Sequence, residues 1–134
     1  MPSATVLRSD RSHDQALTMF IIAFVVSVVL ALVLVGSAYA KLAKDPKVVD
    51  SIVKTVGVPE NRLWVLAALE LAGAAGLLIG LLWAPLGIAA AIGVVLYFVG
   101  AVLAHLRKRD PGFVPPSVIL VVAVGTLVLR LATV

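Results

Sequence analysis

The chain has 134 residues, of which 62% are hydrophobic and 13% are charged. A soluble domain is nearer one half apolar and one quarter charged, so the composition predicts a single compact membrane domain. The sequence contains no cysteine, which excludes disulfides, thiolate metal or iron–sulfur sites and a dithiol redox relay within it. The formal charge of +4 comes from residues beside apolar runs, where Lys and Arg set topology, so we expect no nucleic-acid partner.

Residues 1–16 are polar, mixed in charge and without periodicity, which predicts a mobile tail. An apolar run over 17–40 follows it. The run ends in Ala38-Tyr39-Ala40, which resembles a signal-peptidase site, but it is longer than the roughly 7–15 apolar residues of a signal peptide. We therefore expect an uncleaved first transmembrane helix.

The connection 41–62 carries a helical pattern of its own. Asp45 is a suitable N-cap, Pro46 suits a first helical position, and Gly57 and Pro59 end the segment. Between them, apolar residues recur at helical spacing: Val48, Val49, Ile52, Val53 and Val56. This pattern predicts a short amphipathic helix in the membrane interface, and a helix that docks a partner is the alternative.

Three further spans are expected over 63–82, 86–104 and 118–131. Twenty helical residues cover about 30 Å, the thickness of the hydrocarbon core. The short turn at Trp83-Ala84-Pro85 makes the second and third spans an antiparallel hairpin. Arg130, near the end of the last span, can extend its guanidinium to the headgroups. The predicted fold is an all-α integral membrane protein, a four-helix bundle over residues 17–134 with one interfacial helix.

The basic residues are distributed unequally between the two sides of this bundle. The first and third connections carry eight Lys and Arg residues, and the opposite side carries three. The positive-inside rule then places 41–62 and 105–117 in the cytoplasm and both termini outside, in a multi-pass cell-membrane protein.

Glu70 is the acidic residue that stands well inside a predicted span. A carboxylate there costs about 2.5 kcal/mol or more on insertion scales, so it normally faces a partner or a cavity. Hairpin geometry puts Glu70 level with residue 98, and Tyr97 is the strong hydrogen-bonding side chain nearby. We expect a Tyr97–Glu70 hydrogen bond, and if this is Glu70's only task, Glu70→Gln should change stability little.

Small residues at close spacing let helices approach one another. On the second and third helices these predicted packing positions are Ala72, Gly73, Gly76, Gly80, Gly93 and Gly100.

A polar cluster lies where the spans meet the basic connections: Lys41, Arg62, His105, Arg109 and Asp110. One reading is a collar that sets topology and faces lipid headgroups. The other is a site for an anion or a quinone headgroup beneath Glu70. The two histidines lie at separate places, one in the tail and one at a helix end, so they predict neither a haem nor a metal site.

Three segments resemble DoxX-like membrane proteins. Residues 36–42 are similar to the Gly-x-x-Lys-Leu that closes the first helix of that family, with two extra residues before the lysine. Residues 69–78, Leu-Glu-Leu-Ala-Gly-Ala-Ala-Gly-Leu-Leu, match its Leu-Glu-Leu-x-Gly-x-x-Gly-Leu-Leu segment, and residues 100–110 resemble its Gly-Ala-x-x-x-His-x-x-x-x-Asp stretch. The resemblance implies a four-helix membrane bundle. Some members of that family are likened to quinone-linked oxidoreductase subunits, one is associated with redox partner proteins, and eukaryotic relatives act as receptor assembly factors.

Three functions follow as hypotheses. The first is a non-enzymatic accessory or assembly subunit, without catalytic residues or intrinsic cofactor, that binds another membrane protein or a second copy of itself. The alternative is a quinone-binding subunit of an oxidoreductase, with Glu70 as proton acceptor and quinone or a bound lipid as ligand. The third is an oligomeric, proton-coupled transporter of a small solute.

Overall fold

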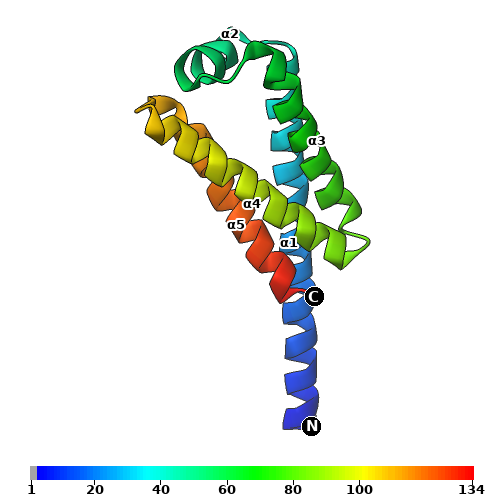
Figure 1. Cartoon of the computed structure of the whole chain (residues 1–134). Helices are drawn as coiled ribbons and strands as arrows, with labels where there is room; N and C mark the ends of the chain where they lie inside the picture. Colours follow the sequence, from blue (N-terminus) through cyan, green and yellow to red (C-terminus); the bar gives the residue numbers. More distant parts are fainter. Residues whose placement is uncertain (1–2) are drawn as a thin grey trace.

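The computed structural model of this chain describes residues 3–134, which form helices and contain no strand. Four long helices dominate Figure 1: α1 (Ala4–Leu42), α3 (Leu63–Ile79), α4 (Ala84–Arg107) and α5 (Val114–Ala132). The 3-10 turn η2 (Glu60–Arg62) leads into α3, and the 3-10 turn η3 (Pro111–Phe113) leads into α5. All four segments are long and apolar enough to cross a membrane. The predicted all-helical, four-span architecture is confirmed.

Helix α1 begins far earlier than the sequence pattern indicates. Ser3 is its N-cap, and the Ser3 hydroxyl accepts a hydrogen bond from the amide of Val6. Residues 4–16, for which the sequence predicts a mobile tail without periodicity, are therefore helical, while residues 1 and 2 lie outside the described part. No Gly or Pro interrupts 4–16, and extending an existing helix needs no new nucleus. In Figure 1 this exposed part of α1 projects past the rest of the bundle.

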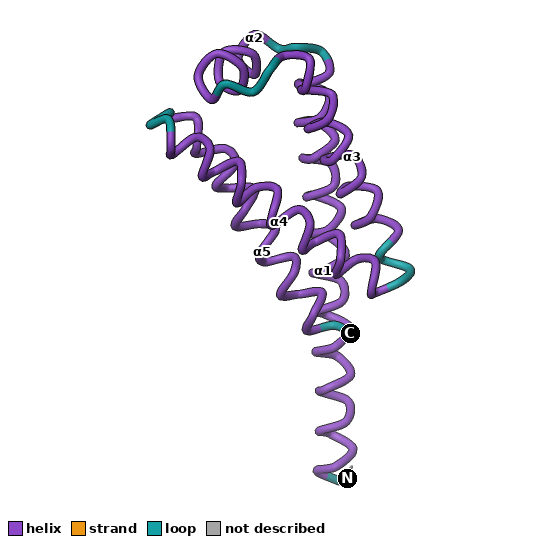
Figure 2. The backbone as a smooth tube through the Cα atoms, in the orientation of Figure 1, coloured by secondary structure: helices purple, strands orange, loops and turns teal. Residues whose placement is uncertain are grey.

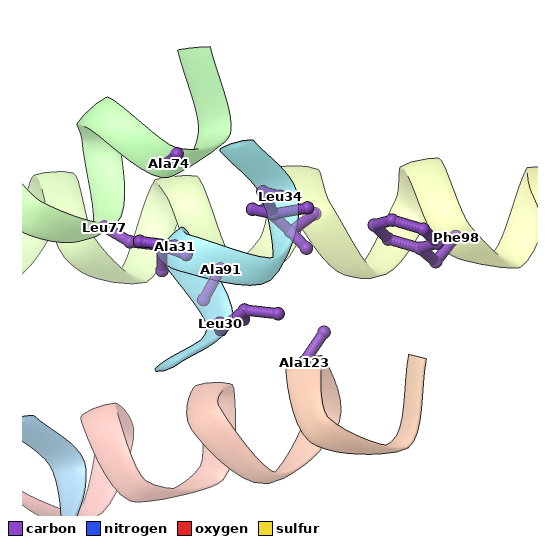
Figure 3. Packing of buried hydrophobic residues seen from close by; sticks show 9 residues of the cluster. Leu30, Ala31, Leu34, Ala74, Leu77, Ala91, Phe98 and Ala123 are labelled. Atoms are coloured by element: carbon purple, nitrogen blue, oxygen red, sulfur yellow. The ribbon is translucent and has the colours of Figure 1, made fainter. Parts of the chain in front are cut away.

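The helices pack as two pairs, α1 with α3 and α4 with α5, and α3 and α4 are joined as an antiparallel hairpin. Figure 1 shows the two pairs crossing near the middle and diverging toward the end that carries α2. We call this end, formed by residues 41–62 and 105–117, the basic end. The apolar core lies where the pairs cross and unites side chains of all four long helices (Figure 3): Leu30, Ala31, Leu34, Ala74, Leu77, Ala91, Val94, Phe98 and Ala123.

Glycines allow the hairpin helices to touch at their backbones. A Cβ added to Gly80 would collide with the backbone of Gly87, and one added to Gly76 would lie 2.7 Å from the Cβ of Ala90. A Cβ on Gly73 would lie 2.9 Å from a methyl group of Val94. Gly73 and Gly76 of α3 and its C-cap Gly80 thus lie at close contacts with α4.

The other three small positions do not serve this contact. A Cβ on Gly93 or Gly100 would meet nothing within 4 Å, and Ala72 is exposed. The packing role predicted for them is therefore wrong. The reason is helical phase, because the buried positions of α4 are 87, 91, 94, 98 and 105, and residues 93 and 100 lie on a neighbouring face.

The connection at the basic end is helical, as predicted, but its winding differs. Helix α2 (Pro46–Val48) continues directly into η1 (Val49–Val56), a π-helix, and Figure 2 shows the two as one coiled segment. The Asp45 side chain accepts a hydrogen bond of 2.9 Å from the Lys47 amide, and Gly57 ends the segment with φ of 93°. The apolar face is half-buried, whereas the polar face, with Asp50 and Lys54, is exposed. Together α2 and η1 form the α2–η1 segment.

Arg130 does not extend toward headgroups, so that expectation is wrong. Its side chain is buried, and Nη2 donates a hydrogen bond of 2.5 Å to the carbonyl oxygen of Gly80. The turn after α3 leaves this carbonyl without a helical partner, and α5 ends beside it. A cation at the C-terminal end of a helix also interacts favourably with the helix dipole.

Candidate functional site

Glu70 is the centre of a buried polar cluster between α1, α3 and α4. It is only 2% exposed, and its Oε1 atom lies 2.5 Å from Nζ of Lys41. The Tyr97 hydroxyl donates to the same oxygen at 2.7 Å. The predicted hydrogen bond between Tyr97 and Glu70 is present, and the ion pair with Lys41 is an addition. We call Lys41, Glu70 and Tyr97 the buried triad.

Lys41 lies in the last turn of α1, where its ammonium group also donates to Ser37 Oγ at 2.8 Å. The expectation that it joins a headgroup-facing collar is wrong, since the residue is only 7% exposed. Helices α1 and α3 are antiparallel neighbours, which brings the end of α1 level with the first half of α3. The 20-residue connection hides this pairing from sequence counting. The sequence did offer a chemical indication of this pairing, because a carboxylate inside a membrane span is normally paired with a charged partner.

The second oxygen of the Glu70 carboxylate has no partner in the described residues. Oε2 of Glu70 and Oγ of Ser27 are the two buried side-chain polar atoms there that form no hydrogen bond. An unpaired buried acceptor is unfavourable by roughly 1–3 kcal/mol, and more when charged. Oε2 thus lacks a hydrogen-bond donor among the described residues.

A groove of about 590 Å³ opens above the buried triad at the basic end. We call it the basic-end groove. The triad lies at its inner part, and His105 and the half-buried face of the α2–η1 segment supply further walls, including Ser51 and Ile52. Most of the remaining lining is apolar, from α3, α4 and α5.

A second polar cluster ties the α2–η1 segment to the end of α4. Asp110 Oδ2 lies 2.6 Å from His105 Nδ1 and accepts a hydrogen bond of 3.1 Å from Ser51 Oγ. Its Oδ1 accepts from the Gly112 amide at 3.1 Å. The hydrogen bond from Gly112, followed by that of His105, holds the pKa of Asp110 below its ordinary value. We call Ser51, His105 and Asp110 the latch.

The polar cluster predicted at this end is therefore brought together only in part. Lys41 and His105 line the same groove, and Asp110 orients His105. Arg62 and Arg109 are exposed and form no side-chain hydrogen bond or ion pair among the described residues, which agrees with a headgroup-facing position. Within residues 3–134 no group of three His, Cys, Asp or Glu side chains is placed to hold a metal ion.

Four helices of membrane-spanning length, with a buried charge pair between α1 and α3 and a mostly apolar groove beside it, define this chain as a small polytopic membrane protein. The model of the DoxX-like family matches residues 25–127, which include the triad and the latch. The chain belongs to the DoxX-like family. No curated protein and no solved structure matches it significantly.

Proposed function

We propose that this protein is a binding subunit of the membrane, whose basic-end groove takes a lipophilic molecule with a polar ring of the quinone or quinol class. The observation that carries the proposal is the unpartnered Oε2 of Glu70, a buried charged acceptor beside a groove of about 590 Å³. A quinol hydroxyl would supply the donor that this oxygen lacks.

The composition of the groove supports a small ligand. Ligand pockets are about 300–1,000 Å³, mostly apolar, with a few convergent polar groups. Here the polar groups include Glu70, the ammonium of Lys41 as a donor to a carbonyl, and His105. Nδ1 of His105 already contacts the carboxylate of Asp110, so Nε2 remains to bind the ligand. Lys41 and Glu70 thus offer a donor and an acceptor. The donor suits the carbonyl of a quinone, and the acceptor suits the hydroxyl of a quinol.

The test is a calorimetric titration of the protein in nanodiscs with a decyl-benzoquinone and with its quinol. The key variant is the double substitution Lys41→Met with Glu70→Gln, which removes both charges and so leaves neither stranded. We expect saturable binding by the wild type and a loss of at least tenfold in affinity in the double variant. The control is Glu60→Gln, an exposed carboxylate outside the groove, with unchanged binding. No saturable binding, or equal affinity in the double variant, overturns the proposal.

An accessory or assembly role is the second candidate, and the N-terminal part of α1 favours it. Residues 4–16 are exposed along their whole length and project past the bundle (Figure 1). This helical segment is exposed on every side in the described structure, so it offers a surface on which another protein would bind. A mild-detergent pull-down should recover a stoichiometric membrane partner, or a second copy, that is lost when residues 4–12 are deleted. Recovery of a free monomer under several gentle conditions would contradict this role.

Proton-coupled solute transport stays a prediction of the sequence. Its test is flux into proteoliposomes, and a flux equal to that of empty vesicles would dispose of it.

A further inference from the structure

We infer that the ligand of this protein is an amphiphile, with its polar ring in the basic-end groove and a long apolar chain in a second groove between α3 and α4. This inference rests on the proposed function and names the class of molecule that the site takes. The second groove has a volume of about 540 Å³. We call it the hairpin groove.

The two grooves meet at the buried triad. Four residues line both of them, namely Leu69, Glu70, Tyr97 and Phe98. The carboxylate with the unpartnered oxygen therefore stands at the junction. A ring that binds there would have its substituents directed into one groove or the other.

The hairpin groove runs from this junction toward the turn between α3 and α4. Its walls on α4 extend from Leu96 back to Leu86, about 15 Å of helix at 1.5 Å per residue. Beyond Glu70 and the Tyr97 hydroxyl at the junction, its lining side chains are apolar. Gly93 widens it, since a Cβ there would meet nothing within 4 Å.

The direction of the hairpin groove fits an amphiphile in a bilayer. It leaves the basic end, where Lys and Arg gather, and leads into the hydrocarbon region. Its rim includes Leu69 and Leu96, which are 55% and 65% exposed and thus face the acyl chains. A chain can therefore enter sideways from the lipid while the ring remains at the interface, as membrane amphiphiles orient themselves.

The gain from the chain should be moderate. An apolar tail that leaves lipid for the groove exchanges one apolar environment for another, so its contribution comes from packing and orientation. We expect the chain to raise affinity on the order of tenfold when ligand concentrations are expressed per lipid.

The experiment compares a benzoquinone without a chain and the same ring with a decyl chain, in nanodiscs. Gly93→Leu adds bulk to the hairpin groove and keeps all three triad residues, and Ala72→Leu, at another lining position, is a second filling variant. Gly125→Leu is the matched control, because its added Cβ also meets nothing within 4 Å and it lines neither groove. Circular dichroism and apparent melting temperature identify any variant that fails to fold.

We expect both filling variants to abolish the tenfold preference for the decyl form while the chainless ring binds as before. Gly125→Leu should retain the wild-type preference. Chainless binding with no chain preference in the wild type, or a preference that survives both filling variants, overturns the amphiphile inference and leaves the proposed function standing. If neither probe binds the wild type, the proposed function fails and this inference fails with it.

Discussion

At the scale of single residues, the buried triad changes what Glu70 is expected to do. With Tyr97 as its sole partner, an amide at position 70 would preserve the hydrogen bond. The ion pair of 2.5 Å with Lys41 removes that equivalence, since the carboxylate neutralises an ammonium group that is itself nearly inaccessible. Breaking one side of a buried pair is costly because the remaining charge loses its compensation.

We therefore expect both Glu70→Gln and Lys41→Met to destabilise the protein by about 3 kcal/mol. The double variant should recover most of this loss, because no uncompensated charge remains. Tyr97→Phe should lower stability by only about 1 kcal/mol, the usual contribution of one neutral hydrogen bond. Thermal unfolding in one detergent, followed by circular dichroism, measures all four. A double variant less stable than either single one would show that the two charges act independently.

At the scale of elements, the hairpin of α3 and α4 depends on close backbone approach. Pairs that meet across it have residue numbers that sum to 166 or 167, as in Gly76 with Ala90 and Glu70 with Tyr97. The position of the turn predicts a sum of 168, which is the sum that puts Glu70 level with residue 98. The observed sums differ from it by one or two. The register is thus set by the short turn and by the absence of side chains at the crossing.

Gly80→Ala should destabilise the bundle by roughly 1–3 kcal/mol, because its methyl group would enter the backbone of Gly87 and force the helices apart. Gly93→Ala should be neutral or stabilising by up to about 1 kcal/mol, since alanine favours helix and the site has free space. Apparent melting temperatures of the two variants give the comparison. Equal losses would mean that glycine flexibility, and not packing, matters at both positions.

The latch links the α2–η1 segment to the end of α4 through the hydrogen bond from Ser51 to Asp110. The pKa of Asp110 is lowered in the folded protein, so its contribution to stability is fully present above its ordinary value of about 4. The contribution is lost as the pH falls from there through the lowered pKa, because the protonated carboxyl no longer pairs with His105.

We expect amide exchange over residues 46–58 to become faster as the pH falls below about 4, after correction for the intrinsic rates. In Asp110→Asn the exchange should already be fast at neutral pH and should show no such step. Ser51→Ala, which removes one hydrogen bond of 3.1 Å, should give an intermediate effect. A segment equally protected in all three proteins would show that the latch does not hold it.

At the scale of the whole molecule, an even number of spans places both termini on the side opposite the basic end, as Figure 1 shows. The excess of basic residues predicts that the basic end faces the cytoplasm. The absence of cysteine makes this testable without background labelling.

A single cysteine at Ser12, on the exposed part of α1, should react with a membrane-impermeant maleimide in intact cells. A cysteine at Thr55, on the exposed face of η1, should react only after the membrane is opened. The reverse pattern would show that the charge bias does not decide the topology of this chain.

The sequence alone determined the membrane class, the four spans, the α3–α4 hairpin, the Tyr97–Glu70 contact and the helix after Asp45. Each of these depends on local signals, such as apolar run length, a short turn, a cap or residue counting along two directly linked helices. The tertiary structure alone decided that Lys41 pairs with Glu70, that Arg130 binds the Gly80 carbonyl, that Gly93 and Gly100 face open space, and that two grooves meet at the triad. These features join helices separated by long connections or depend on helical phase, and residue spacing along the chain does not specify how such helices pack.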